Sequence, residues 1–191
     1  MPETSSTSTT SSRGIALLIT GLPAAGKTTL GRALADHFED KLGRRVSLFD
    51  GDEIRKLLSS ELGFSREHRR LNVLRQGFLA TEICRHGGIA ICTLIAPYEA
   101  DRAEMRQLVA RNGSFIEVYL STPLTECERR DPKGLYARAR SGNLQHMTGI
   151  DDPYEPPSRP ELKLDSTRMT IEQLVERVIG YLTERGLLAR G

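Results

Sequence analysis

An eight-residue glycine-rich motif near the N-terminus constrains this chain more than any other feature of its sequence. Residues 21–28 read Gly-Leu-Pro-Ala-Ala-Gly-Lys-Thr, follow an apolar run at 15–19 and open an amphipathic stretch at 27–42. A motif of this spacing between a strand and a helix is typical of a phosphate-binding loop, or P-loop. The alternative, a chance glycine-rich turn, is disfavoured by this strand–loop–helix setting.

The residue types in the motif match what a bound triphosphate needs. Glycines at 21 and 26 let successive backbone N–H groups point at phosphate oxygens, and the start of the helix adds a partial positive charge. Lys27 is expected to reach the β- and γ-phosphates of ATP, and the Thr28 hydroxyl to ligate Mg²⁺. The residues expected to contact ATP here are Gly21, Ala24, Ala25, Gly26, Lys27, Thr28 and Thr29.

Short apolar runs alternate with longer amphipathic ones along the chain. Strands are expected at 15–20, 46–49, 88–94, 115–120 and 162–164, and helices at 27–42, 52–60, 66–85, 98–111, 123–129 and 170–185. This alternation predicts an α/β fold, the three-layer P-loop NTPase fold, with a mostly parallel five-stranded sheet and helices on both faces.

The chain of 191 residues, 38% of them apolar, fits one domain. Residues 1–12 are polar and contain no Val, Ile, Leu or Phe, which predicts a disordered Ser/Thr-rich tail before a single P-loop kinase domain at 13–191. Residues 131–160, rich in proline and glycine, combine basic residues such as Lys133 with the acidic pair Asp151–Asp152. Such a composition is typical of a mobile lid loop that covers a phosphate site.

Composition excludes several other classes of protein. A net charge of only +2 argues against a nucleic-acid-coating surface, and the longest apolar runs are too short to cross a bilayer. No basic region followed by an apolar stretch opens the chain, so no secretory signal is expected. Cys84, Cys92 and Cys127 have neither pairing nor metal-ligand spacing, which favours reduced core thiols in a cytoplasmic protein.

A second cluster of chemistry-bearing residues follows the second expected strand. Asp50 directly follows that strand, where a P-loop protein places a carboxylate near its metal ion, through water. Asp52 can cap the next helix and can also accept a proton from an attacking hydroxyl. Arg55 shares a helix face with Asp52, and Phe64 is a plausible exposed aromatic for stacking on a base, although core packing would also explain it.

Taken together, these segments resemble the adenylyl-sulfate kinases (APS kinases), from about residue 14 to residue 188. The resemblance rests on the runs Phe49-Asp-Gly-Asp-Glu-Ile-Arg55 and Leu62-Gly-Phe-Ser65, on Arg69 and Asn72, and on Ile95-Ala-Pro-Tyr98 and Phe115-Ile-Glu-Val118. The most specific block runs from Cys127 to Arg140 and continues as Thr148-Gly-Ile-Asp-Asp-Pro-Tyr-Glu155 and Pro160-Glu-Leu162. A generic P-loop kinase is not expected to carry this lid block.

The resemblance implies transfer of the ATP γ-phosphate to the 3′-hydroxyl of adenosine 5′-phosphosulfate, giving 3′-phosphoadenylyl sulfate and ADP in sulfate assimilation. Asp52 would lie near the 3′-hydroxyl, and Lys133 would bridge the donor and acceptor phosphates. The other residues that the resemblance places around the acceptor are Arg55 and Arg69 on the phosphosulfate, Asn72 beside them, Phe64 on the adenine, and Ile95, Ala96, Met147 and Thr148 along the pocket. Arg130 would lie near the ATP adenine.

The resemblance also implies a homodimer, because this family tends to dimerise, working alone or beside an ATP sulfurylase. Three positions depart from the family pattern. Ala96 stands where many members have a serine considered as a phosphoryl carrier, so transfer is expected to be direct and in line. Met147 replaces a phenylalanine that would face Phe64 across the adenine. Leu71 replaces the usual acidic residue before Asn72, a change that the sequence does not explain.

Two other functions remain open at this point. One is another small-molecule P-loop kinase, of the gluconate, shikimate or nucleoside-monophosphate sort, which has no reason to keep the lid block. The other is an inactive nucleotide-binding regulatory domain attached to sulfurylase machinery. Such a domain would be expected to lose Lys27, Thr28 or Asp52 first, and all three are present.

Overall fold

Five parallel strands form the centre of the computed structural model, which describes residues 13–189. The strands are β1 (Gly14–Thr20), β2 (Val46–Asp50), β3 (Ile89–Thr93), β4 (Gly113–Leu120) and β5 (Leu162–Leu164). Their order across the sheet is β2-β3-β1-β4-β5, and every neighbouring pair is parallel. The predicted α/β fold with a five-stranded parallel sheet is confirmed.

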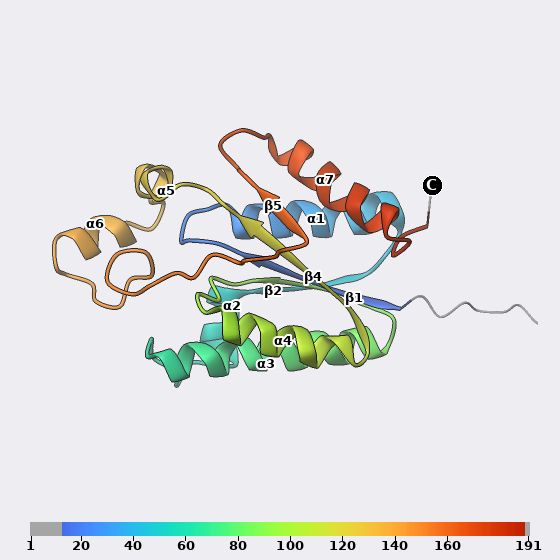
Figure 1. The fold of residues 1–191 in the computed structure, drawn as a ribbon, viewed down its shortest axis with the longest axis horizontal. Helices are drawn as coiled ribbons and strands as arrows, with labels where there is room; N and C mark the ends of the chain where they lie inside the picture. Colours follow the sequence, from blue (N-terminus) through green and yellow to red (C-terminus); the bar gives the residue numbers. More distant parts are fainter. Residues whose placement is uncertain (1–12, 190–191) are drawn as a thin grey trace, which may run out of the picture.

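Helices cover both faces of this sheet, so the molecule has three layers (Figure 1). The helices are α1 (Lys27–Leu42), α2 (Gly51–Leu57), α3 (Arg66–Arg85), α4 (Glu99–Ala110), α5 (Leu124–Arg130), α6 (Leu135–Arg140) and α7 (Ile171–Glu184). One face carries α1 and α7, and the other carries α3 and α4, while α5 and α6 project at one end of the molecule (Figure 1). Among the described residues, no helix is long and apolar enough to span a membrane.

The sheet separates two hydrophobic cores, and the alternation of side chains along β1 shows why. Ile15, Leu17 and Ile19 belong to the core under α1 and α7, whereas Ala16 and Leu18 belong to the core under α3 and α4. All seven residues of β1 are buried. Because successive side chains of a strand point to opposite faces, a central strand covered on both sides is apolar along nearly its whole length.

Helix α1 lies unusually close to the sheet at Gly31. A Cβ atom added at this position would lie 2.5 Å from Thr93 Cγ2 on β3 and 3.2 Å from Leu48 Cδ1 on β2. No side chain therefore fits between the helix and the strands here. This close approach fixes the height of α1, and of the glycine-rich loop that precedes it, above the sheet.

Two features differ from what the sequence predicts. The segment 131–160 contains a helix, α6, which starts after Gly134 in the left-handed conformation and whose first turn donates N–H groups to the Asp131 side chain, Tyr136 N at 3.2 Å and Ala137 N at 3.0 Å. Helix α2 ends at Leu57 rather than at residue 60. The predicted disordered tail at 1–12 lies outside the described residues.

The three cysteines are free and buried, as the sequence predicts. Burial raises the pKa of the Cys84 thiol to about 11 and that of Cys92 to about 12. Both thiols therefore stay protonated at neutral pH and pack as small apolar side chains.

Candidate active site

The glycine-rich loop adopts a backbone that turns sharply around a space at the carboxyl end of β1. Gly21 has φ 152° and Gly26 φ 103°, and Ala24 adopts φ 60° without being a glycine. A Cβ atom on Gly21 would lie 2.7 Å from the carbonyl oxygen of Leu120 on β4. Gly26 is the residue at the start of α1, so the N–H groups of the first turn face the loop's interior.

Lys27 is folded back onto this loop. Its Nζ donates to the carbonyl oxygen of Gly21 at 3.0 Å and to that of Leu22 at 2.7 Å. Burial lowers the pKa of Lys27 to about 8, although the charges of Asp52 and Asp50 act in the opposite direction. The amine therefore carries its charge at neutral pH, and it is held by backbone oxygens that an anionic ligand can replace.

Thr28 and Asp50 bring two side-chain oxygens together next to the loop. Thr28 Oγ1 donates to Asp50 Oδ2 at 2.7 Å, and Thr93 Oγ1 donates to the same oxygen at 3.3 Å. Burial would raise the pKa of Asp50, but these hydrogen bonds and those from the backbone of α2 outweigh it, so the pKa lies below its ordinary value. Asp50 is therefore ionised at neutral pH.

This donor set suits a hard divalent cation. Hydroxyl and carboxylate oxygens are the ligands that Mg²⁺ accepts, and Mg²⁺ usually keeps several waters and takes only one or two protein ligands beside substrate phosphates. The described residues contain no group of three or more His, Cys, Asp and Glu side chains placed to hold a metal ion. Thr28 and Asp50 thus fit a metal held jointly with a phosphate ligand.

Asp52 faces the segment 131–160, the predicted lid. Lys133, located between α5 and α6, forms an ion pair with Asp52 Oδ2. The prediction that Asp52 caps the next helix is wrong: Asp50 is the cap, because its Oδ1 accepts from Asp52 N at 3.0 Å, and Asp52 lies within α2. With its carboxylate free of capping, the exposed Asp52 can interact with groups that enter from the lid side.

Arg55, Phe64 and Arg69 converge next to Asp52. The guanidinium of Arg55 lies 4.6 Å from the centre of the Phe64 ring, and that of Arg69 lies 5.5 Å from it. Phe64 is 52% exposed, which confirms that this aromatic lies on the surface. Burial and the positive charge of Arg69 lower the pKa of Arg55, while Asp52 opposes this shift. The cluster places the partly exposed Arg55, the buried Arg69 and the exposed face of Phe64 side by side.

Arg69 also ties this cluster to the lid. Its Nη2 donates to the carbonyl oxygen of His146 at 2.6 Å and to Asp152 Oδ2 at 3.0 Å, and its Nε donates to Phe64 O at 2.9 Å. No sequence pattern pairs Arg69 with Asp152, although Asp152 belongs to the block 148–155 of the predicted lid. Because its buried side chain is held by three hydrogen bonds, Arg69 is a rigid link between Phe64 and the residues 146–152.

Two residues of the predicted lid, Met147 and Thr148, are buried. Met147 is 6% exposed and belongs to the larger hydrophobic core, so its thioether is packed inside the molecule rather than displayed opposite Phe64. Within residues 13–189, the buried Thr148 Oγ1 and Asn72 Oδ1 have no hydrogen-bond partner. Unpaired buried polar atoms are costly, which is a reason to expect water or a ligand beside them.

The segment Ile95–Ala96 runs along the carboxyl edge of the sheet. Thr20 Oγ1, at the end of β1, donates to Ile95 O at 2.6 Å and also contacts the Tyr154 hydroxyl at 3.0 Å. Ala96 has φ 43°, in the left-handed region that an alanine rarely adopts. A cavity of about 640 Å³ opens beside the loop, lined among others by Leu22, Tyr119 and Tyr154.

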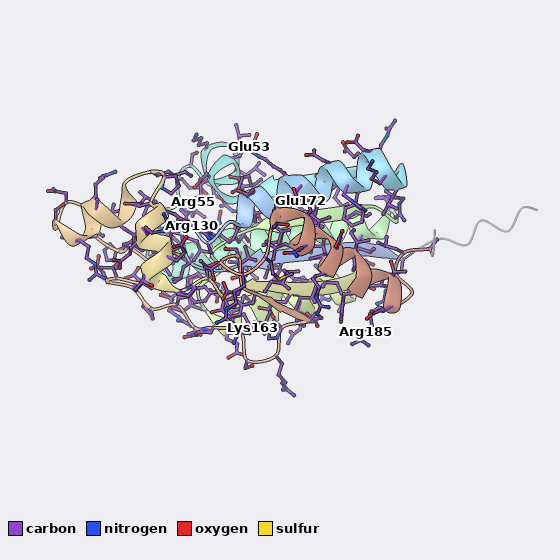
Figure 2. The ribbon with its side chains drawn as sticks, turned by 90° about the horizontal axis from the view of Figure 1, so that it is seen from above. Glu53, Arg55, Arg130, Lys163, Glu172 and Arg185 are labelled. Carbon is purple, nitrogen blue, oxygen red and sulfur yellow. The ribbon has the colours of Figure 1, made fainter. Side chains whose placement is uncertain are left out.

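Arg130 is the last residue of α5, and its side chain lies beside Gly26, next to the start of α1. Its Nη1 donates to Ser166 Oγ at 2.9 Å, and the same atom is 3.9 Å from the position of a Cβ added at Gly26. Ser166, which the sequence did not single out, also bonds to Ala25 O at 3.0 Å. Arg55 and Arg130 lie toward the same end of the molecule (Figure 2).

Comparison with known proteins gives consistent relatives. Residues 13–165 match the family model described as adenylylsulphate kinase. The chain is 47% identical over 176 residues to an adenylyl-sulfate kinase of Synechococcus sp. (strain JA-3-3Ab), covering 92% of this chain and 98% of the relative. It is 43% identical over 180 residues to a sulfate adenylyltransferase of Neurospora crassa, but spans only 31% of that longer protein.

Among solved structures, a Mycobacterium tuberculosis APS kinase in complex with AMPPNP and APS has a TM-score of 0.85 and 38% identity to this chain. The match covers 90% of this chain and 98% of the M. tuberculosis chain. The similarity therefore includes the sheet, both helical layers and the lid.

Proposed function

The chain belongs to the adenylylsulphate kinase family, and from this premise we propose how its residues transfer the γ-phosphate of ATP to the 3′-hydroxyl of adenosine 5′-phosphosulfate. The products are 3′-phosphoadenylyl sulfate and ADP. The observation that carries the proposal is the position of Asp52 on α2, two residues after Asp50, which bonds to Thr28 of the loop, and three residues before Arg55. Asp52 thus lies between the phosphate-binding loop and the cluster of arginines and aromatic ring.

The glycine-rich loop is the proposed donor site. Its backbone N–H groups and the start of α1 bind the phosphates of ATP, and Lys27 leaves the carbonyl oxygens of Gly21 and Leu22 to contact the β- and γ-phosphates. Arg130 flanks the adenine side of the loop. Thr28 and Asp50 would hold Mg²⁺, which neutralises charge on the transferring phosphoryl group.

The cluster on α2 and α3 is the proposed acceptor site. Arg55 and Arg69 bind the phosphosulfate, because guanidinium groups match the geometry of phosphate and sulfate oxygens. Phe64 stacks on the adenine, and Asn72, Thr148 and the backbone at 95–96 line the pocket. Because residue 147 is a methionine and is buried, the proposed stacking on the base rests on Phe64.

The transfer itself is proposed to be direct and in line. The carboxylate of Asp52 accepts the proton of the 3′-hydroxyl while that oxygen bonds to the γ-phosphorus, and the bond to the β–γ bridging oxygen breaks as ADP leaves. Lys133 moves from Asp52 to the phosphates, where its charge stabilises both nucleotides. Ala96 has no oxygen that could carry the phosphoryl group.

A coupled ADP-release assay tests this function. Purified protein with MgATP is given adenylyl sulfate, gluconate, shikimate or AMP, and turnover is expected with adenylyl sulfate alone. Turnover with a different acceptor alone would select another small-molecule kinase. ATP binding without turnover would select a regulatory domain.

Replacing Phe64 by alanine is expected to weaken binding of the acceptor and to leave binding of ATP unchanged. Stacking of a base on an aromatic side chain is worth about 1–3 kcal/mol, so the KM for adenylyl sulfate should rise roughly 5- to 150-fold. The KM for ATP should stay unchanged. Phe78→Ala is the matched control, because Phe78 is also an exposed phenylalanine, 60% exposed, but lies farther along α3. An unchanged KM for adenylyl sulfate in Phe64→Ala would remove the ring from the adenine site.

We also propose a homodimer in the cytoplasm. Large apolar side chains exposed at the end of α2, Leu57 at 71% and Leu58 at 49%, support burial against a second copy. A related APS kinase from Thiobacillus denitrificans is hexameric, and the N. crassa relative named sulfate adenylyltransferase supports an association with an ATP sulfurylase. The free buried cysteines support a reducing compartment.

A further inference from the structure

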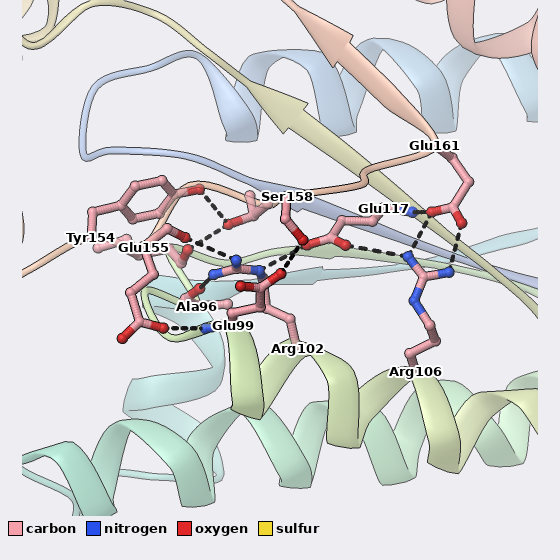
Figure 3. A network of polar contacts seen from close by, with 11 residues as sticks. Ala96, Glu99, Arg102, Arg106, Glu117, Tyr154, Glu155, Ser158 and Glu161 are labelled. Carbon is pink, nitrogen blue, oxygen red and sulfur yellow. Dashed lines mark hydrogen bonds and ion pairs between the residues drawn. The ribbon is translucent and has the colours of Figure 1, made fainter.

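A fully buried arginine, Arg102 on α4, joins three separate segments of the chain. Its side chain is 2% exposed. It donates from Nε to Glu117 Oε1 on β4, from Nη1 to the carbonyl oxygen of Ala96, and from Nη2 to that of Glu155, each at 2.8 Å (Figure 3). Because a guanidinium is a rigid planar fork, one side chain fixes these three acceptors relative to one another.

The first of these segments is the wall of the proposed acceptor pocket. Ala96 adopts φ 43°, a conformation that persists in a non-glycine residue only where its surroundings hold it. The carbonyl oxygen of Ala96 is held by Arg102, and that of the preceding Ile95 by Thr20. The bend of the wall is therefore maintained by hydrogen bonds at two successive peptide groups.

The second segment is the end of the lid. Glu155 N donates to Pro97 O at 2.8 Å, and the Glu155 side chain accepts from Glu99 N at 2.7 Å, so this residue is fastened to the same loop that carries Ala96. Three residues earlier, Asp152 pairs with Arg69 of the proposed acceptor site. We call Ala96, Arg102 and Glu155 the Arg102 clamp, since they connect the lid end to the pocket wall.

The neighbouring Arg106 provides an internal comparison. It lies one turn further along α4 and shares Glu117, donating from Nη2 to Oε2 at 3.2 Å. Its other ion pair is with Glu161, at 2.6 and 2.7 Å. Within the described part of the chain, its hydrogen bonds reach neither Ala96 nor Glu155 (Figure 3). Arg106 therefore belongs to the same ion network without contacting the pocket or the lid end.

We propose that Arg102 is a positioning residue for adenylyl sulfate. It holds the pocket wall at Ala96 and the lid end at Glu155 in one fixed arrangement, so that the acceptor finds a preformed site. The P-loop is outside this clamp, so the donor nucleotide does not depend on it. The inference rests on the proposed function, because it assigns Arg102 to the acceptor of that reaction.

Arg102→Lys keeps the charge but offers a single ammonium on a flexible stem in place of the three-way fork. Its kcat/KM for adenylyl sulfate is expected to fall about 10- to 100-fold, mainly through a higher KM, as a small displacement of a bound substrate can do. The KM for ATP is expected to stay unchanged. Arg106→Lys, which disturbs the same network, is expected to lower the melting temperature comparably while leaving the KM for adenylyl sulfate unchanged.

The wild-type chain is assayed first, and its turnover with adenylyl sulfate tests the proposed function separately from the role of Arg102. Given an active wild type, an unchanged KM for adenylyl sulfate in Arg102→Lys would overturn the proposal. So would an equal rise in that KM in Arg106→Lys, which would reduce Arg102 to a general contribution to stability.

A second variant keeps the inference testable if Arg102→Lys does not fold. Glu155 is exposed, and Glu155→Ala removes only its side-chain bond to Glu99 N, loosening the lid end of the clamp. The KM for adenylyl sulfate is expected to rise about threefold, the effect of losing a modest hydrogen bond, with the KM for ATP unchanged. A wild-type KM for adenylyl sulfate in this variant would refute the claim that fastening the lid end to the loop of Ala96 positions the acceptor.

Discussion

Replacement of Lys27 by methionine is expected to lower kcat on the order of 10³-fold. A reduction of this size is expected because the variant lacks a preorganised positive charge where negative charge develops in the transition state. Methionine keeps the length and apolar stem of the side chain but cannot neutralise phosphate oxygens. The pKa of Lys27, about 8, leaves the amine charged at neutral pH, so the wild-type residue supplies a full positive charge. Steady-state assays with MgATP and adenylyl sulfate measure the loss.

The same variant should not lose stability. The pKa of Lys27 is lowered on folding, so the folded protein disfavours the charged amine, and removing it should leave the melting temperature at pH 7 no lower than in the wild type. Lys163→Met is the matched control, since Lys163 is an exposed lysine on β5. A kcat for Lys27→Met within about tenfold of wild type would exclude Lys27 from stabilising the transferring phosphoryl group.

Asp52→Asn is expected to lower kcat about 10²- to 10⁴-fold, the usual contribution of a general base, with little change in ATP binding. Asparagine has the size of aspartate but does not accept the proton of the 3′-hydroxyl. Turnover is measured in the ADP-release assay, and ATP binding by calorimetry or fluorescence.

Glu53→Gln controls for the loss of one negative charge on α2, because Glu53 is the adjacent acidic residue and is exposed (Figure 2). That variant should keep its turnover. If Asp52→Asn retained wild-type turnover, the proton of the acceptor would have to go elsewhere, and Asp52 would be limited to its ion pair with Lys133.

Local signals account for the parts of the fold that the sequence predicts well. The run from β1 through the glycine-rich loop into α1 follows from residues within a few positions of one another, and α1, α3 and β5 begin and end where the patterns place them. Burial on both faces of the sheet explains the near-continuous apolar strands β1 and β3. Helix α6 escapes prediction because the prolines and glycines around it dominate a short pattern of six residues.

The contacts that complete the site depend on residues far apart in sequence. Asp152 meets Arg69 across 83 positions and Ser166 meets Arg130 across 36, and no local pattern indicates either pair. Asp50 caps α2 because the helix starts at Gly51, so the carboxylate of Asp52 forms an ion pair with Lys133 and takes no part in capping. The proposed roles of the site residues rest on this geometry together with the family, and the assays above decide them.

The contact at Gly31 couples two halves of the proposed donor site. Gly31 is one helical turn after Lys27, and its nearest neighbour on the sheet, Thr93, donates a hydrogen bond to the carboxylate of Asp50. Lys27 and Asp50, the acid proposed to bind the metal, thus take their separation from the point where the backbone of α1 meets the side chain of Thr93. A side chain at position 31 would push α1 away from the sheet and increase the distance between Lys27 and Asp50.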